Sequence, residues 1–156
     1  MKKKRIILLT ILGVLLIGAV SNVALSDEAK VDMKLFNRAN DQEIPSEANG
    51  ISVKTEQEQY DTSTEKIIVL INNIGSEDIN PGHQGDMKLQ KKVGDTWREF
   101  PQKPDTITED YGILFPSGMQ SSLVLSVDQL KYKLVPGEYR ALPGGGVAAP
   151  FTVVED

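Results

Sequence analysis

The feature that most constrains this chain is a two-residue alternation of apolar and polar side chains that begins after Gly50. Residues 51–56 give the first example, and the alternation returns at 87–93 and 122–127. A period of two is typical of a β-strand that buries one face. No segment after Gly50 keeps the helical period of 3.6 residues, so the pattern predicts an all-β fold.

Turn-forming residues divide this region into seven short strands. The aliphatic run at 67–71 favours a strand at the centre of a sheet. Gly94-Asp95 predicts a two-residue hairpin with glycine at its first position. The expected strands are 51–56, 67–71, 87–93, 97–100, 123–127, 138–142 and 151–154. They predict a seven-stranded antiparallel immunoglobulin-like sandwich, with the domain at 51–156.

Residues 27–50 have a different composition, rich in Asn, Asp, Gln, Pro and Ser and poor in apolar side chains. Such a composition is typical of a linker. We therefore expect a polar tether at 27–50, with a short helical or extended turn near Met33.

The first 26 residues have the pattern of a targeting segment. Basic residues at 2–5 precede the apolar stretch 6–20, and a more polar part ends at Ser26. This order predicts a signal peptide cleaved after Ser26. The run from 6 to 25 is also long enough for a retained membrane anchor, which needs about 20 residues. Both alternatives place the remaining chain outside the cytoplasmic membrane, with membrane contact only through this segment.

Charge and cysteine content exclude several classes of function. The 17 basic and 22 acidic residues give a net charge of −5, which becomes −9 without the four basic residues of the leader. A chain this acidic is repelled by phosphate backbones, so no nucleic-acid partner is expected. The absence of cysteine excludes disulfides, thiolate metal sites and a cysteine nucleophile.

Four motifs follow one another in a familiar order. An alternating strand ends in tyrosine (51–60), and an apolar strand ends in asparagines (67–73). LQKKVGDTW (89–97) and LVPGEYR (134–140) come later. This order resembles bacterial immunoglobulin-like domains found in exported proteins of Gram-positive bacteria. The resemblance implies a sandwich fold, an extracytoplasmic setting, and a binding or spacer role without catalytic residues.

Two aromatic residues of these motifs are predicted to be structural. Tyr139 follows the Pro136-Gly137 corner, where its buried hydroxyl can bond back to the corner backbone. Trp97, the only tryptophan, lies in a hairpin and is expected to pack against the fold.

The polar residues do not predict an enzyme. His83 is the only histidine and lacks a G-x-S-x-G elbow. The carboxylate pairs at 56/58, 77/78 and 109/110 lie at strand ends or in polar loops, where solvated charge is the ordinary state. We expect no catalytic residue, cofactor or metal. The alternative of calcium in the 74–85 loop stays open, because Asp78, Asn80, His83 and Asp86 are oxygen- or nitrogen-bearing neighbours.

The binding site is expected where loops meet. In such a sandwich the loops at 74–85 and 143–148 emerge at the same end, and both are rich in glycine and proline. The candidate binding residues are Asn80, Pro81, His83, Gly144 and Gly145. The predicted function is a non-enzymatic extracytoplasmic interaction or accessory module of a bacterial cell envelope. Its partner would be another protein or an envelope component. The alternative is a protease inhibitor that uses this loop end, since Asn80-Pro81-Gly82 resembles an inhibitor loop.

Overall fold

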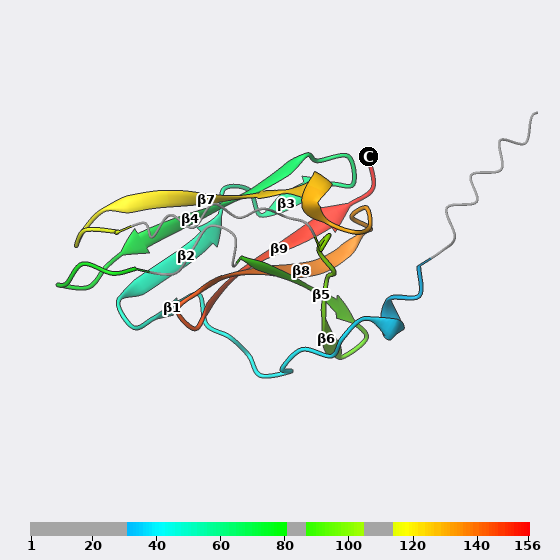
Figure 1. Cartoon of the computed structure of the whole chain (residues 1–156), viewed down its shortest axis with the longest axis horizontal. Helices are drawn as coiled ribbons and strands as arrows, with labels where there is room; N and C mark the ends of the chain where they lie inside the picture. The colour runs from blue at the N-terminus through cyan, green and yellow to red at the C-terminus, as the bar shows by residue number, and fades with distance from the viewer. Residues whose placement is uncertain (1–30, 81–86, 105–113) are drawn as a thin grey trace, which may run out of the picture. The chain divides into compact units, whose positions relative to one another are not determined.

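The computed structural model describes residues 31–80, 87–104 and 114–156. Residues Asp32–Asp156 form one compact unit, in which two β-sheets enclose a shared apolar core (Figure 1). The predicted leader, 1–26, lies outside the described residues. None of the helices in the described part of the chain is long and apolar enough to cross a membrane.

One sheet has four strands and the other has five. The first runs in the order β1 (Glu47–Ala48), β2 (Ile51–Thr55), β4 (Lys66–Asn73) and β7 (Gln120–Ser126). The second runs β3 (Gln59–Asp61), β9 (Val147–Val154), β8 (Gly137–Gly144), β5 (Lys88–Val93) and β6 (Thr96–Glu99). The described residues also contain two single-turn 3-10 helices, η1 (Met33–Leu35) and η3 (Val127–Gln129).

The all-β sandwich is confirmed, and all seven expected strands are present. The structure adds the short strands β1 and β3. It also departs from a fully antiparallel fold, because β3 pairs in parallel with β9. The chain reaches β9 by leaving the first sheet after Thr55, and the buried ring of Tyr60 then packs edge-on against Phe151.

The period-two pattern explains which residues form the core. In β4 the residues at 67, 69 and 71 point inward and are fully buried, while their neighbours at 68 and 70 are half-buried on the outer face. β7 pairs with β4 in unbroken register, with Leu123 opposite Val69 and Leu125 opposite Ile67. Both leucines are buried, so the two strands present one continuous apolar face to the second sheet.

The hairpin at Gly94-Asp95 forms as predicted. Val93 pairs with Thr96, which leaves a two-residue turn in which Gly94 has a positive φ of 62°. The loop expected at 143–148 is shorter in the structure. β8 extends to Gly144 and β9 begins at Val147, because the glycines allow a tight turn at 145–146.

The Pro-Gly corner before β8 has the tyrosine corner that the sequence predicts. The Tyr139 hydroxyl donates to the Val135 carbonyl at 2.8 Å and accepts from the Val135 N–H at 3.1 Å. Lys91 covers the ring, with its Nζ 4.6 Å from the ring centre and 2.8 Å from the Pro136 carbonyl. Burial raises the pKa of Tyr139 to about 12 and lowers the pKa of Lys91.

Tyr139→Phe is expected to lower the free energy of unfolding by about 1–2 kcal/mol at neutral pH, because both backbone groups of Val135 lose their partner. The pKa of Tyr139 is about 12 when folded, against 10.0 for an ordinary tyrosine. A group whose pKa is raised by folding stabilises the folded state at pH values below its unfolded pKa. This stabilisation is lost as the pH rises through the folded pKa. The advantage of the parent over Tyr139→Phe should therefore decline from about pH 10 towards 12 in denaturant titrations. A difference independent of pH would contradict this.

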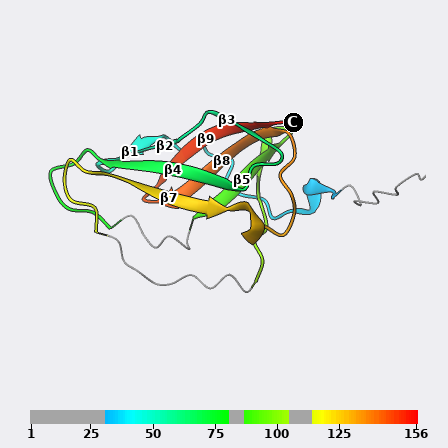
Figure 2. The ribbon, with the colours of Figure 1, turned by 90° about the horizontal axis from the view of Figure 1, so that it is seen from above.

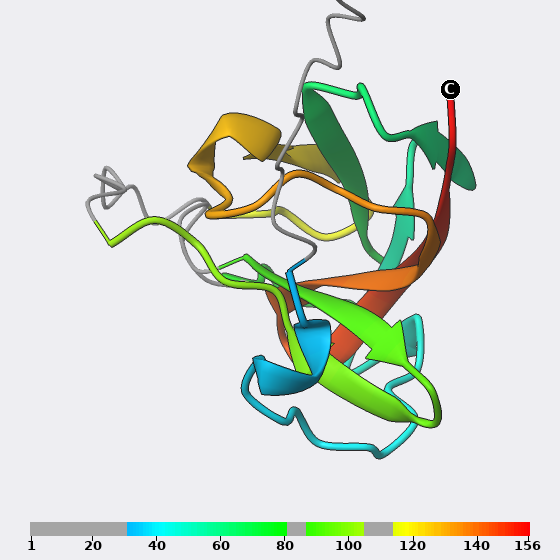
Figure 3. The same ribbon diagram turned by 90° about the vertical axis from the view of Figure 1, so that its right-hand side faces the viewer.

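The N-terminal segment (residues 32–46) differs from the expected polar linker at 27–50. The Ala39 N–H donates to the Trp97 carbonyl at 2.9 Å, and the Glu99 N–H donates to the Asn37 carbonyl at 2.9 Å. The segment thus runs along the outer edge of β6 (Figure 3). Phe36 is buried between Phe100 and Tyr132. Polar composition did not produce a tether here because backbone pairing and one aromatic side chain hold the segment.

Candidate functional site

The structure describes three of the five predicted binding residues. Asn80, Gly144 and Gly145 are exposed, whereas Pro81 and His83 lie outside the described residues. Asn80 follows Ile79, which pairs with Phe115 through two backbone hydrogen bonds of 3.0 and 2.8 Å. The described part of the 74–85 loop is therefore bonded to residues that precede β7.

The two predicted loops are linked through a third turn, Asn49-Gly50. Its Gly50 carbonyl accepts from the N–H groups of Ile74 and Gly75 at 2.8 and 3.2 Å. On the other side, the Asn49 side-chain amide lies 3.4 Å from the Gly145 carbonyl. Residues 49–50, 73–80, 114–119 and 144–146 together form what we call the loop end, at the left of Figure 1. The expectation that these loops share one end agrees with this geometry.

Asn73, the last residue of β4, holds the loop end together. The residue is 1% exposed. The amide nitrogen donates to the carbonyls of Glu77 and Phe115 at 2.7 and 2.8 Å. The amide oxygen accepts from the Gly75 N–H at 3.0 Å. A single buried side chain thus fixes the backbone of both neighbouring loops, and all three bonds are to main-chain groups.

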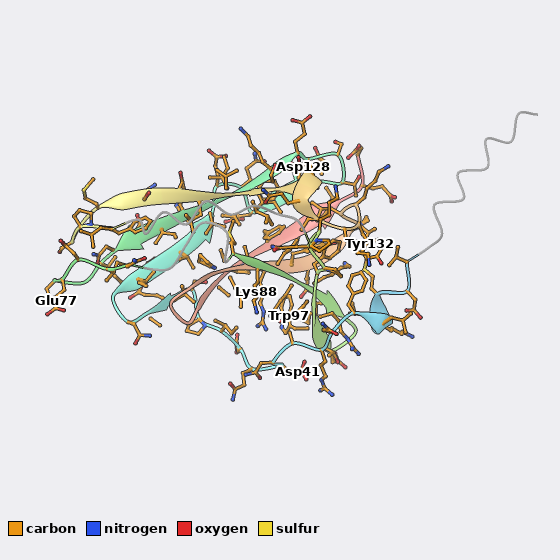
Figure 4. The ribbon with its side chains drawn as sticks, viewed as in Figure 1. Asp41, Glu77, Lys88, Trp97, Asp128 and Tyr132 are labelled. Atoms are coloured by element: carbon orange, nitrogen blue, oxygen red, sulfur yellow. The ribbon has the colours of Figure 1, made fainter. Side chains whose placement is uncertain are left out.

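Further contacts join the same loops at the surface. The Ser117 hydroxyl donates to the Gly75 carbonyl at 2.7 Å, and its N–H donates to an Asp78 carboxylate oxygen at 3.1 Å. Glu77 lies at the tip of this end (Figure 4). A side chain at Gly145 is disfavoured by its positive φ of 68°, and a Cβ there would lie 2.7 Å from Ile51 Cδ1, which would have to move. The backbone of the loop end is fixed from several directions.

Large apolar side chains are exposed on these fixed loops. Ile74 is 53% exposed and Met119 is 55% exposed, and Leu114 is also exposed. Asn73 and Phe115, the chain neighbours of Ile74 and Leu114, are buried, and the Met119 carbonyl accepts from the Asn73 N–H at 3.0 Å. The backbone that carries the three side chains is therefore anchored. Exposed apolar groups on an ordered surface are typical of interaction sites, whereas isolated ones are common everywhere. Here all three belong to one end of the sandwich.

Charged groups at the loop end form no metal centre in the described structure. Among residues 31–80, 87–104 and 114–156, no group of three or more His, Asp or Glu side chains is placed to hold a metal ion. Asp78 is used as a hydrogen-bond acceptor by Ser117. His83 and Asp86, which the calcium alternative also needs, lie outside the described residues, as does the carboxylate pair at 109/110.

Trp97 is placed far from these loops, beside the N-terminal segment (Figure 4). Its ring is partly exposed rather than enclosed, and it lies 4.2 Å from the guanidinium carbon of Arg140. Arg140 is 3% exposed and donates to the Gln90 side chain at 2.7 Å. It also donates to the carbonyls of Asn40 and Gln42 at 2.8 and 3.1 Å. Trp97 thus packs against a buried cation.

Asp41 completes this contact between the N-terminal segment and β6. One of its carboxylate oxygens accepts from the Trp97 N–H at 3.2 Å. The other accepts from Arg38, which holds the pKa of Asp41 below its usual range. Burial lowers the pKa of Arg140. This cluster is fully explained by the docking of residues 32–46, so we assign it a structural role.

Comparison with known proteins decides the family. The model of the bacterial Ig-like domain matches residues 47–143, which is more than half of the chain. The chain belongs to the bacterial Ig-like domain family. The matched region runs from β1 into β8 and includes the turn at Asn49-Gly50, Asn73 and the tyrosine corner.

Other comparisons add little to this Ig-like domain. No curated protein matches its sequence. A similar solved structure is the beta-glucosidase from Listeria innocua in complex with gluconolactone, at 13% identity and a TM-score of 0.32. The match covers 66% of this chain and 16% of that chain.

Sequence reasoning missed three features of this Ig-like domain that position its loops and its N-terminal segment. The dipeptide Asn49-Gly50 forms a two-residue hairpin in which both φ angles are positive, 53° and 77°. Asn-Gly between strands is a strong hairpin signal and could have revealed β1. Asn73 and Arg140 carry no comparable local signal, because their partners lie up to 42 and 100 residues away in the sequence.

Proposed function

We propose that this Ig-like domain is a non-enzymatic interaction or accessory module of a bacterial cell envelope, and that its loop end binds another protein or an envelope component. The observation that carries the proposal is the combination found at the loop end. There, exposed apolar side chains stand on backbone that Asn73 and Gly50 hold in place. Preorganised loops bind without a large ordering cost, which favours recognition at such a surface.

The direction of the chain supports this choice of surface. β4 runs from Lys66 to Asn73 and so carries the chain towards the loop end. The first and last described segments lie at the other end, where Phe36 stacks on Tyr132 and Thr62 bonds to Asp156. The loop end is therefore at the opposite end of the sandwich from Phe36 and from the last described residues.

The N-terminal sequence supports a location outside the cytoplasmic membrane. Basic residues at 2–5 followed by the apolar stretch 6–20 favour export, either with cleavage after Ser26 or with the segment kept as an anchor. Sequencing the N-terminus of the exported protein separates these two forms. A first residue near Asp27 indicates cleavage, and an intact Met1 indicates an anchor.

A pair of charge substitutions tests the loop end directly. Ile74→Glu combined with Met119→Glu should reduce capture of the partner from envelope extract by at least about tenfold, because each buried apolar contact contributes on the order of 1.5–3 kcal/mol. The matched control is Leu35→Glu, since Leu35 is 82% exposed and lies at the opposite end. Circular dichroism should show that all variants remain folded.

The pattern of capture decides the outcome. Loss in the loop-end variant with retention in the Leu35 variant supports the proposal. Equal capture by all three proteins would remove the loop end from consideration. If the captured partner is a protease, its activity with and without the domain distinguishes the inhibitor alternative from accessory binding.

A further inference from the structure

The four edge strands of the sandwich are protected to very different degrees. β1 has two residues and β3 has three, so each offers little edge for pairing. The outer edge of β6 is covered by the N-terminal segment, through the bonds of Asn37 and Ala39. β7 has seven residues, Gln120–Ser126, and borders the four-stranded sheet (Figure 2). No other strand pairs with its outer edge within residues 31–80, 87–104 and 114–156.

The register with β4 shows which backbone groups of β7 face outward. The Asn73 N–H donates to the Met119 carbonyl, and the Val127 N–H donates to the Glu65 carbonyl. Hydrogen-bonded positions alternate in an antiparallel pair. The odd-numbered residues of β7 therefore bond to β4. The even-numbered residues direct their N–H and C=O groups away from the sheet, and these are Gln120, Ser122, Val124 and Ser126.

β7 lacks the features by which natural proteins prevent edge pairing. Charged side chains, proline and bulges normally protect an exposed edge. β7 reads QSSLVLS, and its register with β4 is regular throughout. No charged residue occurs from Leu114 to Val127, in a chain whose residues are 25% charged.

We propose that β7 pairs antiparallel with β7 of a second copy of this chain, which joins two four-stranded sheets into one continuous sheet. A two-fold axis at Leu123 places Ser122 opposite Val124 of the other copy, and Gln120 opposite Ser126. Every residue whose backbone groups face outward then meets another such residue, so these N–H and C=O groups are satisfied in pairs.

The distribution of charge makes this edge the place where a second copy can pair, because β7 itself carries no charged side chain. The chain has a net charge of −5, so two copies repel over most of their surfaces. β7 is a long strand on which self-pairing places no like charges opposite one another. The edge is also distinct from the loop end, so this inference does not depend on the proposed function.

A charge exchange across the interface tests the pairing and its register. A Lys copy carries Ser122→Lys and Val124→Lys, and a Glu copy carries Ser122→Glu and Val124→Glu. Each copy alone places like charges opposite one another, whereas a mixture places Lys opposite Glu at both positions. The oligomeric state is measured by sedimentation velocity on the exported protein, with its N-terminal segment if cells retain it. Protein concentrations from about 10 µM to 1 mM cover the range of weak interfaces.

The expected result is a concentration-dependent dimer for the parent, monomers for each variant alone, and a heterodimer on mixing. A parent that stays monomeric at 1 mM would overturn the proposal, as would a Lys copy that dimerises as well as the parent.

Because the chain has no cysteine, a second experiment uses Ser122→Cys in one tagged copy and Val124→Cys in another. A disulfide should link them during export, because hydrogen-bonded pairs have Cα atoms about 5.5 Å apart. A matched Ser76→Cys pair at the loop end should not form one. Cross-linking of β7 to a different protein only would show that a foreign strand uses the edge, which also overturns self-pairing.

Discussion

Arg140→Ala is expected to lower the free energy of unfolding by about 3 kcal/mol and to detach the N-terminal segment from the sheet. The buried guanidinium donates to three acceptors, and two of them are the carbonyls of Asn40 and Gln42. Hydrogen bonds to charged groups contribute about 1.5–3 kcal/mol each, and their acceptors are left unsatisfied when the donor is removed. The stacked contact with Trp97 is lost as well.

Two measurements separate detachment from general instability. Denaturant titration gives the change in unfolding free energy, and hydrogen exchange reports the amides of Ala39 and Glu99, which pair the segment with β6. We expect both amides to lose protection in Arg140→Ala while the amides of β4 keep theirs. Arg38→Ala is the control, since the Arg38 side chain is largely exposed and its pairing with Asp41 contributes little. Unchanged protection of Ala39 and Glu99 in Arg140→Ala would contradict this account of the segment.

The strands could be predicted because their signals are local. Alternation identifies a strand within a few residues, and the glycine of Gly94-Asp95 specifies its turn without reference to the rest of the fold. The tyrosine corner is equally local, since Tyr139 bonds to Val135 only four residues earlier. Each of these features is encoded in a short stretch of sequence and does not depend on its partners across the sandwich.

The docked N-terminal segment could not be predicted in the same way. The segment is held through its main-chain groups, which bond to Trp97, Glu99 and Arg140. Most of its side chains can therefore be polar without weakening its attachment. Composition measures side chains, so it cannot distinguish such a segment from a free linker. Phe36 is the buried aromatic residue of the segment, and its partners Phe100 and Tyr132 come from distant parts of the chain.

The loop end was predictable in outline only. Sandwich topology places the loops after β4 and β8 at the same end. It does not reveal that the Gly50 carbonyl receives the N–H groups of Ile74 and Gly75, because that contact depends on β1, an unrecognised strand. It also does not reveal which asparagine of the pair at 72–73 points inward. The register of β4 decides this, with Asn72 on the outer face and Asn73 in the core.

Asn73 should therefore be the most sensitive position of the loop end. Asn73→Ala is expected to lower the free energy of unfolding by about 3 kcal/mol, because three hydrogen bonds of a buried side chain are lost. The Glu77 carbonyl loses its partner, whereas the Phe115 carbonyl keeps the Ile79 N–H and the Gly75 N–H keeps the Gly50 carbonyl. Asn73→Asp keeps the shape but should be at least as damaging at neutral pH, since a carboxylate cannot donate to the carbonyls of Glu77 and Phe115. Asn72→Ala is the control at the neighbouring, half-buried position, and its cost should be below about 1 kcal/mol.

The same variants distinguish a rigid binding surface from one that only needs apolar groups. Asn73→Ala leaves Ile74 and Met119 in place but removes the bonds that fix their backbone. If preorganisation matters, this variant should capture the partner more weakly than the parent at a temperature where both are folded. Hydrogen exchange should show lost protection at Gly75 and Ile79, and not in β5 or β8. The folded Asn73→Ala protein could instead capture the partner as well as the parent while its loop amides exchange rapidly. That result would mean that the apolar side chains suffice for binding and that the fixed loops serve stability alone.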